Sequence, residues 1–364
     1  MKERIVLAYS GGLDTSAAIP WLAERHHAEI VAVTLDLGQG GELEEIRDRA
    51  LATGAVRAHV LDVREEFARE YILRALQAGA LYEGRYPMAT ALGRPLIARK
   101  LVEIAAIEQA TTIAHGSTGN DQVRIEITAR ALNPAIRVIA LPRDGNGPIP
   151  APAVSPYSID TNLWGRSIAG GVLADPWAEP PEDVYTLTKA ATDAPNMPAY
   201  VEIAFERGVP VAVNGVPMAL TELIESLSII AGQHGVGRID MVENAVAGIK
   251  SREIYEAPAA VVLHTAHKEL EMFVSPKDLE QLTRELSATY ADLVYSGLWF
   301  TATREALDAF TARVQESVTG VVRVKLFKGH HIVVGRKSPN HSARPAEPRT
   351  RTAVPSAGLR VPRS

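Results

Sequence analysis

The feature that most constrains the fold is the transition from strand to turn to helix in residues 4–22, RIVLAYSGGLDTSAAIPWL. Its apolar run, residues 5–9, is typical of a buried parallel strand, because half-exposed strands alternate instead. Gly11 and Gly12 have no Cβ and can adopt positive φ, so backbone N–H groups can crowd around an anion. A helix begins next, and its free N–H groups and dipole also favour an anion, so the sequence predicts a phosphate cradle. The short polar side chains available to the cradle are Ser10, Asp14, Thr15 and Ser16.

A tight turn capped by Asp14 or Ser16 would by itself explain two glycines, because such turns are abundant. The whole string directly after a strand favours the phosphate site. It is neither a Walker A loop, since no GxxxxGK[ST] follows a strand, nor a dinucleotide fingerprint, since the turn lacks GxGxxG. The pattern SGGxD[ST]S resembles the PP-loop of ATP pyrophosphatases, which cleave ATP between its α and β phosphates. The longer AYSGGLDTS, residues 8–16, resembles one branch of them, the argininosuccinate synthases.

The bulk composition indicates a globular protein with room for two domains, since the chain has 364 residues, 46% of them hydrophobic and 22% charged. The net charge of −5 gives no support to a nucleic-acid partner, which needs a basic surface. No apolar run reaches the length of a membrane span, and the N-terminus lacks a signal-peptide core. We therefore expect a cytoplasmic protein without a membrane or nucleic-acid partner.

The chain contains no cysteine, which excludes disulfides and thiolate zinc sites. PP-loop relatives that transfer sulfur or take ammonia from glutamine commonly use a cysteine nucleophile, so those branches are disfavoured. The amine that this protein uses should then come from a free substrate. Pairs of histidines occur at His264 with His267 and at His330 with His331, but without an HExxH pattern or carboxylate partners, so no metal site is predicted.

Strand and helix patterns alternate in the first half of the chain, which indicates a mostly parallel sheet with helices on both faces. The predicted strands are 28–36, 56–61, 111–114 and 136–140, and the predicted helices are 42–53, 65–78, 94–109 and 121–132. Residues 141–156 are rich in proline and glycine and mark a domain boundary. Ligands of such sheets bind beyond the carboxyl ends of the strands.

The second half predicts an α+β domain. Strands are expected at 200–205, 210–213 and 259–263, helices at 220–234, 276–294 and 304–317, and a closing hairpin of 321–327 with 331–334, turning at Lys328 and Gly329. From Ser338 onward arginine, proline, serine and alanine dominate, and we expect disorder. The predicted organisation is an ATP-binding domain at 1–150, an α+β synthetase and multimerisation domain at 151–338, and a divergent tail at 339–364.

A second turn, HGSTGNDQVR at residues 115–124, again follows a short strand and opens a helix. Gly116 and Gly119 allow a ligand to approach the backbone, and Arg124 lies one turn inside the helix, where it can meet a carboxylate or phosphate. An N-cap with surface polar residues is the alternative. Beside the first turn, a binding role is favoured, because both turns would flank one crevice.

The resemblance to the argininosuccinate synthases extends over residues 4–339. It is carried by the strings EGRY (83–86), PYSIDTNLWGRS (156–167), GGVL (170–173), HGVGRIDMVEN (234–244), GIKSREIYE (248–256) and LVY (293–295). It implies an α/β PP-loop domain of the adenine nucleotide alpha hydrolase kind, joined to an α+β domain. It also implies a homotetrameric ligase of arginine biosynthesis that joins citrulline and aspartate with ATP and Mg²⁺. In that reaction the ureido oxygen of citrulline attacks the α-phosphorus, and the aspartate amine then displaces AMP.

The resemblance also implies the site residues. ATP would be bound by Ala8, Tyr9, Ser10, Gly11, Gly12, Leu13, Asp14, Thr15, Ser16, Leu35 and Gly116. Aspartate would be bound by Thr118, Asn120 and Asp121, and citrulline by Tyr86, Asn120, Arg124, Ser158, Ser167, Glu243 and Tyr255. The catalytic residues would be Asp14, Asp121 and Arg124. Without the resemblance, an exposed carboxylate for Glu243 and a packed ring for Tyr255 would be the simpler interpretations.

Three stretches depart from the family pattern. A Lys-Gly pair that the family carries between Gly119 and Asn120 is absent, which shortens the second loop. A Trp-Arg-bearing segment and a helix before Ser158 are reduced to LPRDGNGPIPAPA, residues 141–153. From Pro339 the arginine- and proline-rich tail, which we interpret as a shifted reading frame or an eroded end, replaces the helix that embraces neighbouring subunits. Ala245 also stands where an arginine is usual.

These departures leave two alternatives to an active ligase. One is a degenerate paralogue that binds ATP with little or no ligase activity, and the other is a nucleotide-sensing protein of the same fold. We expect the altered C-terminus to weaken assembly, so a well-formed tetramer in gel filtration would count against that expectation.

Overall fold

The computed structural model describes residues 3–142 and 156–341. The interpretation of residues 143–155 as part of a domain boundary, and of the chain after residue 341 as a disordered tail, lies outside these described residues. Within them, no helix is long and apolar enough to cross a membrane.

The N-terminal part folds around a five-stranded parallel sheet in the order β3-β2-β1-β4-β5. Its strands are β1 (Arg4–Ala8), β2 (Glu29–Asp36), β3 (Arg57–Asp62), β4 (Thr112–His115) and β5 (Arg137–Ala140). The apolar run of β1 is buried between β2 and β4, which confirms the predicted parallel strand. The chain order reverses on either side of β1, which is where open α/β sheets form their ligand crevice.

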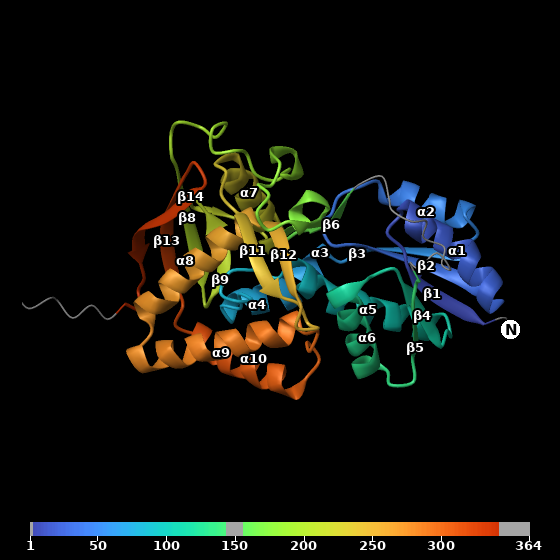
Figure 1. Ribbon diagram of the computed structural model, residues 1–364. Coiled ribbons are helices and arrows are strands. Elements are labelled where there is room, and N and C mark those ends of the chain that lie inside the picture. The colour runs from blue at the N-terminus through green and yellow to red at the C-terminus, as the bar shows by residue number, and fades with distance from the viewer. Residues whose placement is uncertain (1–2, 143–155, 342–364) are drawn as a thin grey trace, which may run out of the picture.

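Helices cover both faces of this sheet (Figure 1). They are α1 (Leu13–His26), α2 (Leu43–Ala52), α5 (Ala89–Ile107) and α6 (Gly119–Leu132). Successive side chains of a strand point to opposite faces. Accordingly, Ile5 and Leu7 pack in one cluster with Ile19 of α1, whereas Val6 packs in another with Leu96 of α5. The predicted helix at 65–78 is also present as a helical run of α3 (Arg64–Glu66), a π-helical turn (Phe67–Ile72) and α4 (Leu73–Gln77).

The C-terminal part contains two antiparallel sheets. The first has the order β10-β9-β8-β13-β14, with β8 (Ala199–Glu206), β9 (Val209–Val213), β10 (Val216–Pro217), β13 (Gly320–Phe327) and β14 (His330–Lys337). The second has the order β11-β12-β7-β6, with β6 (Tyr157–Asn162), β7 (Gly165–Gly170), β11 (Arg238–Asn244) and β12 (Lys250–Glu256). The closing hairpin β13–β14 turns at Lys328 and Gly329, as predicted.

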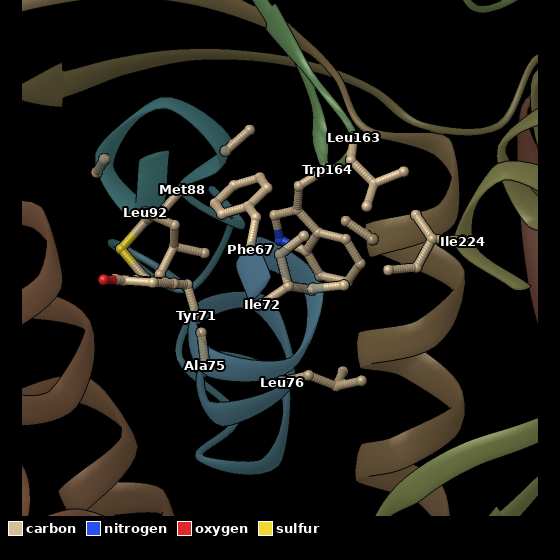
Figure 2. Close-up of a cluster of buried hydrophobic side chains, with 14 of the residues drawn as sticks. Phe67, Tyr71, Ile72, Ala75, Leu76, Met88, Leu92, Leu163, Trp164 and Ile224 are labelled. Carbon is tan, nitrogen blue, oxygen red and sulfur yellow. The ribbon is translucent and has the colours of Figure 1, made fainter. Parts of the chain in front are cut away.

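The helices of this part are α7 (Leu220–Gln233), α8 (Pro258–Val274), α9 (Lys277–Tyr295) and α10 (Ala302–Gln315), with short 3-10 turns at Gly171–Ala174 and Glu182–Val184. One hydrophobic core runs through both parts of the molecule. Figure 2 shows part of this core, with Trp164 among Phe67 and Ile72 of the N-terminal part and Ile224 of α7. The indole Nε1 of Trp164 donates to the carbonyl of Pro87 at 2.9 Å, which fixes the β6–β7 hairpin against the N-terminal part.

The strand predicted at 259–263 is wrong, because these residues lie in the first two turns of α8. Pro258 stands in the first turn of that helix, where its missing N–H costs nothing, and a short buried apolar run does not distinguish helix from strand. The four strands of the second antiparallel sheet were not predicted. β11 (RIDMVEN) alternates only in part, and β6, β7 and β12 lack a clear strand pattern, so in the sequence these residues stand out only through their resemblance to the family.

The buried histidines of α8 predict a loss of stability in mild acid. Burial lowers the pKa of both His264 and His267, that of His264 to about 3, because a charged imidazole would lose its hydration. In the unfolded chain both titrate near ~6.5, so below that pH the unfolded state binds more protons. We expect the free energy of unfolding to fall between pH ~6.5 and ~3, by up to ~1.4 kcal/mol per pH unit for each histidine that stays neutral. Urea unfolding at neutral and at acidic pH measures this decrease in the free energy of unfolding.

In the variant His264→Met, the slope of the free energy of unfolding against pH should decrease by the contribution of one proton, because the titrating imidazole is gone. The substitution breaks no hydrogen bond of Nε2, since that atom has no partner among the described residues. His330→Gln is the matched control, because His330 is exposed at the start of β14. Equal pH slopes in wild type and His264→Met would contradict the account.

Candidate functional site

A cleft of about 1200 Å³ lies between the carboxyl ends of β1, β2 and β4 and one face of the sheet β11-β12-β7-β6. This volume exceeds the usual range for one drug-sized ligand, about 300–1,000 Å³. Most residues named from the sequence line it: Ala8, Tyr9, Ser10, Asp14, Thr15, Leu35, Tyr86, Gly116, Thr118, Asn120, Asp121, Arg124, Ser158, Ser167, Glu243 and Tyr255. Gly11, Gly12, Leu13 and Ser16 are not among the residues that line it. The structure therefore brings both turns and the second sheet to one space.

The first turn is held in shape from behind. Gly11 has φ +79°, and a Cβ at this position would lie 2.8 Å from Cγ1 of Ile46, so only glycine fits without strain. Arg49 of α2 donates to the Gly11 carbonyl at 2.6 Å. The hydroxyl oxygens of Ser10 and Thr15 lie 3.1 Å apart across the turn. Its backbone is therefore fixed before any ligand binds.

The helix predicted after the first turn is confirmed: α1 begins at Leu13 with Gly12 as N-cap, and no described side chain caps its N–H groups. The first turn of the helix contains Asp14 and presents these N–H groups at the end of β1. An anion placed there would satisfy donors that are otherwise left to solvent. Leu13 itself is 80% exposed, and the hydroxyl of Ser16 lies 2.8 Å from that of Tyr9, so both are supporting parts of the loop.

The second turn is anchored by His115 at the end of β4. The backbone N–H of Ser117 donates to Nδ1 of His115 at 3.2 Å, and burial lowers the pKa of His115 to about 4. The imidazole is therefore neutral at physiological pH and acts as an acceptor for the turn. Thr118 precedes α6 and is exposed, while Gly119 opens the helix with φ +56°.

Two arginines clamp the Asp121 carboxylate. Arg124 donates to its Oδ1 at 2.7 Å and Arg94 to its Oδ2 at 2.8 Å, and Arg94 also lies 3.1 Å from Asp160 of β6. Burial alone would raise the pKa of Asp121, but the two cations outweigh it, so the pKa lies below its usual value. Asp121 thus stays charged and can accept a hydrogen bond from an amine. Nη2 of Arg124 has no partner among the described residues and is available to a ligand carboxylate.

Glu243 is a buried carboxylate, 2% exposed, on β11, in the antiparallel sheet that forms the other side of the cleft. Burial raises its pKa, and the hydroxyl of Tyr255, which donates at 2.6 Å, opposes that shift. The ring of Tyr255 stacks on Tyr86 at 3.7 Å. Tyr255 pairs with Ser167 across β12 and β7, so these side chains share the cleft face of the sheet. A positively charged ammonium group is the natural ligand for this carboxylate.

Among the cleft residues that the sequence did not identify as site residues, three carry or bind charges at the centre of this account: Arg94, Glu253 and Tyr295. Burial, followed by the charges of Glu243 and Asp121, raises the pKa of Glu253 to about 7, against a hydrogen bond from Ser251 at 2.8 Å. Glu253 precedes Tyr255 by two residues on β12, and side chains two apart on a strand share a face. The interpretation of Tyr255 as a binding residue could therefore have found it.

Arg94 could also have been found, because it is a charged residue inside an otherwise buried helical run of α5.

We expect Arg94→Met to reduce kcat/KM about 10- to 100-fold, since a hydrogen bond to a charged group contributes about 1.5–3 kcal/mol. Both Asp121 and Asp160 would lose their shared cation. The pKa of Asp121 should rise, moving the acid limb of the pH profile upward.

Arg99→Met is the matched control for that variant. Arg99 lies on the same helix and pairs with Glu66 and Glu103, away from the cleft. Initial rates of pyrophosphate release compare the two variants, and equal losses would show that Arg94 acts only on stability.

Comparison with known proteins agrees with this geometry. Family models match twice: the arginosuccinate synthase N-terminal HUP domain over residues 4–148 and the arginosuccinate synthase C-terminal domain over residues 157–344. Argininosuccinate synthases of Bacillus thuringiensis (strain Al Hakam), Bacillus cereus (strain 03BB102) and Bacillus anthracis are each 54% identical over 353 residues, covering 93% of this chain and 88% of the relative. A solved NAD+ synthetase from Burkholderia pseudomallei covers 36% of this chain and 66% of its own at 23% identity, and its TM-score of 0.24 is too low to support an argument. The two family matches and the relatives together show that this chain belongs to the argininosuccinate synthase family.

Proposed function

We propose that this chain is a ligase of arginine biosynthesis that joins citrulline and aspartate to form argininosuccinate, with cleavage of ATP to AMP and pyrophosphate. Family membership supports the reaction. The observation that carries it is that a single cleft contains the glycine-rich turn after β1 with the uncapped start of α1 and, on its other side, a buried arginine and carboxylate, Arg124 and Glu243. A nucleotide and an amino acid need these two kinds of site next to each other.

In this proposal ATP occupies the first turn, residues 8–16. The N–H groups at the start of α1 would hold its phosphates, and Leu35 and Gly116 would contact the nucleoside. Residues 1–150 would then form the nucleotide-binding domain and residues 151–338 the synthetase domain. The volume of the cleft leaves space for two amino acids beside the nucleotide.

The two amino acids would occupy the far side of the cleft. Citrulline would bind with its carboxylate at Arg124 and its ammonium at Glu243, because these charges are complementary. The stacked tyrosines and the serines of β6 and β7 would line its side chain. Aspartate would bind at the start of α6, where Thr118, Asn120 and Asp121 offer short polar groups.

The reaction then proceeds in two displacements. The ureido oxygen of citrulline attacks the α-phosphorus of ATP and pyrophosphate leaves. The aspartate amine next attacks the ureido carbon, and AMP leaves with the oxygen that came from citrulline. The chain contributes mainly orientation and charge stabilisation, as is usual for transfer at phosphorus. Asp121 remains ionised and would orient the amine as a hydrogen-bond acceptor.

Mg²⁺ fits this site as a partner of the phosphates. No group of three His, Asp or Glu side chains that could hold a metal gathers in residues 3–142 or 156–341, so a cage made by protein alone is not part of the proposal. Mg²⁺ is usually held by one or two carboxylates, phosphate oxygens and waters. Asp14, which lines the cleft in the first turn of α1, would supply the carboxylate. When bound there, Mg²⁺ would neutralise charge on the leaving pyrophosphate.

We further propose that the protein acts in the cytoplasm, where its substrates are free metabolites. The homotetramer of the family stays a prediction for this chain, and light scattering of the purified protein measures it.

The test of the proposed function is the release of pyrophosphate from ATP and Mg²⁺ in the presence of both amino acids. We expect release to require citrulline and aspartate together, with argininosuccinate formed in equal amount. Binding of ATP without any release would overturn the proposal in favour of a degenerate or nucleotide-sensing protein.

A further inference from the structure

Tyr295, the last residue of α9, lines the cleft and is 2% exposed. We propose that Tyr295 is the positioning residue that fixes Asn120, Arg124 and Glu243, three of the polar side chains assigned to citrulline. This inference rests on the proposed function and deepens it. It gives a role to a tyrosine that lies in a helix distant in sequence from all three.

The contacts of Tyr295 reach each of these side chains. Its hydroxyl donates to Oε1 of Glu243 and accepts from Nδ2 of Asn120 at 3.1 Å. Its carbonyl accepts from Nε of Arg124 at 2.7 Å. The guanidinium carbon of Arg124 also lies 4.5 Å from the centroid of the ring. One residue thus orients two groups of α6 and one of β11, which come from the two parts of the molecule.

The hydroxyl matters most for Glu243. Burial raises the pKa of this carboxylate, and the hydrogen bonds from Tyr255 and Tyr295 counteract the shift. Each tyrosine donates to a different carboxylate oxygen. Removing one hydroxyl would leave a buried oxygen without its donor, which is costly for a charged group. Glu243 would then be protonated at higher pH and would no longer attract an ammonium group.

The ring is held in place independently of the hydroxyl. It stacks on Tyr82 with centroids 3.5 Å apart and an interplanar angle of 4°. Tyr82 is itself tied to the carbonyl of Asn244 at 2.6 Å, next to Glu243 on β11. Asn120 is also fixed on its other side, because its Oδ1 accepts from the N–H of Val246 at 2.9 Å. A phenylalanine at 295 should therefore keep the ring, the carbonyl and the stacking, and lose only the hydroxyl.

The test compares Tyr295→Phe with Tyr290→Phe. Tyr290 belongs to the same helix, is 1% exposed, and donates its hydroxyl to Oδ1 of Asp308 at 2.8 Å, outside the cleft. Both variants therefore remove one buried tyrosine hydroxyl bound to a carboxylate. Pyrophosphate release is measured against citrulline with saturating ATP and aspartate, and then against ATP.

We expect Tyr295→Phe to raise the KM for citrulline about 10- to 100-fold, as for a lost hydrogen bond to a charged group, with the KM for ATP within about twofold. The acid limb of kcat/KM for citrulline should move to higher pH, because Glu243 loses a donor. Tyr290→Phe should change neither. Equal citrulline KM values in the two variants, or a parallel rise of every KM in Tyr295→Phe, would overturn the positioning role.

A second measurement separates this inference from the proposed function. The carboxyl pKa of Glu243 is followed by ¹³C NMR in protein labelled at glutamate, with the signal assigned by its loss in Glu243→Gln. Tyr295→Phe should raise that pKa and Tyr290→Phe should not, whether or not the wild type turns over. An unchanged Glu243 pKa overturns the positioning role, whereas a wild type without pyrophosphate release overturns only the proposed reaction.

Discussion

Replacing Arg124 by lysine should lower kcat/KM for citrulline by at least about 100-fold, since hydrogen bonds to charged groups are worth about 1.5–3 kcal/mol each. Arg124 lines the cleft and donates both to Asp121 and to the carbonyl of Tyr295, each at 2.7 Å, and its buried Nη2 has no partner among the described residues. A guanidinium can do this because its donors form a rigid planar fork, whereas an ammonium is a single point charge. Steady-state rates of pyrophosphate release measure the loss.

Arg130→Lys is the matched control for Arg124→Lys. Arg130 lies on the same helix, its side chain is 66% exposed, and its carboxylate neighbour Glu126 is 3.7 Å away. An exposed pair of this kind contributes only about 0–1 kcal/mol, so rates should stay within about twofold of wild type. If the two lysine variants behaved alike, Arg124 would not be the carboxylate-binding residue.

Gly297→Ala should disturb both the stability of the protein and its binding of citrulline. Gly297 has φ +77°, and a Cβ there would lie 2.8 Å from the Cα of Arg124. That atom belongs to the backbone of α6 and cannot move without the helix. We expect the free energy of unfolding to fall by about 2–5 kcal/mol, from about 1–2 for the positive φ and about 1–3 for overpacking. In the protein that remains folded, the KM for citrulline should rise because Arg124 is displaced.

Gly215→Ala separates the cost of the positive φ from the cost of overpacking against Arg124. Gly215 has φ +79°, and a Cβ added there would meet nothing within 4 Å in the part of the chain that the structure describes. This variant should show only the backbone cost of about 1–2 kcal/mol and normal kinetics. Urea unfolding and citrulline KM values check both. Equal unfolding midpoints for the two alanine variants would mean that the contact with Arg124 relaxes freely.

The parallel sheet could be predicted because its signals are local. The apolar run before Ser10, the two glycines and the polar helix start all lie within residues 4–22, and the structure places them as a strand, a turn and a helix. The second antiparallel sheet was not predicted. Its β6–β7 and β11–β12 pairings are local hairpins, but the β12–β7 pairing that joins them spans a long separation. The register that joins Tyr255 to Ser167 links residues that are far apart in sequence. Such pairings depend on tertiary packing rather than on local pattern.

The candidate site also combines residues that the sequence could identify with residues whose roles it could not. Residues of the two turns could be named from sequence because each turn is one contiguous string. Arg94 stands out in the sequence only as a charge inside an apolar helical run, and the contacts of Arg94 and Tyr295 could not be predicted, because their partners come from distant elements: Arg94 joins α6 to β6, and Tyr295 joins α6 to β11. The strand wrongly predicted at 259–263 has a related cause, since a run of five apolar residues suits a helix and a strand equally.

The central claim is that citrulline is activated in this cleft by adenylation of its ureido oxygen. Turnover of citrulline labelled with ¹⁸O in the ureido group, followed by mass spectrometry of the AMP, tests it most directly. Because that oxygen attacks the α-phosphorus and leaves with AMP, we expect one ¹⁸O in each AMP and none in argininosuccinate. AMP without the label, formed while pyrophosphate is released, would contradict the account.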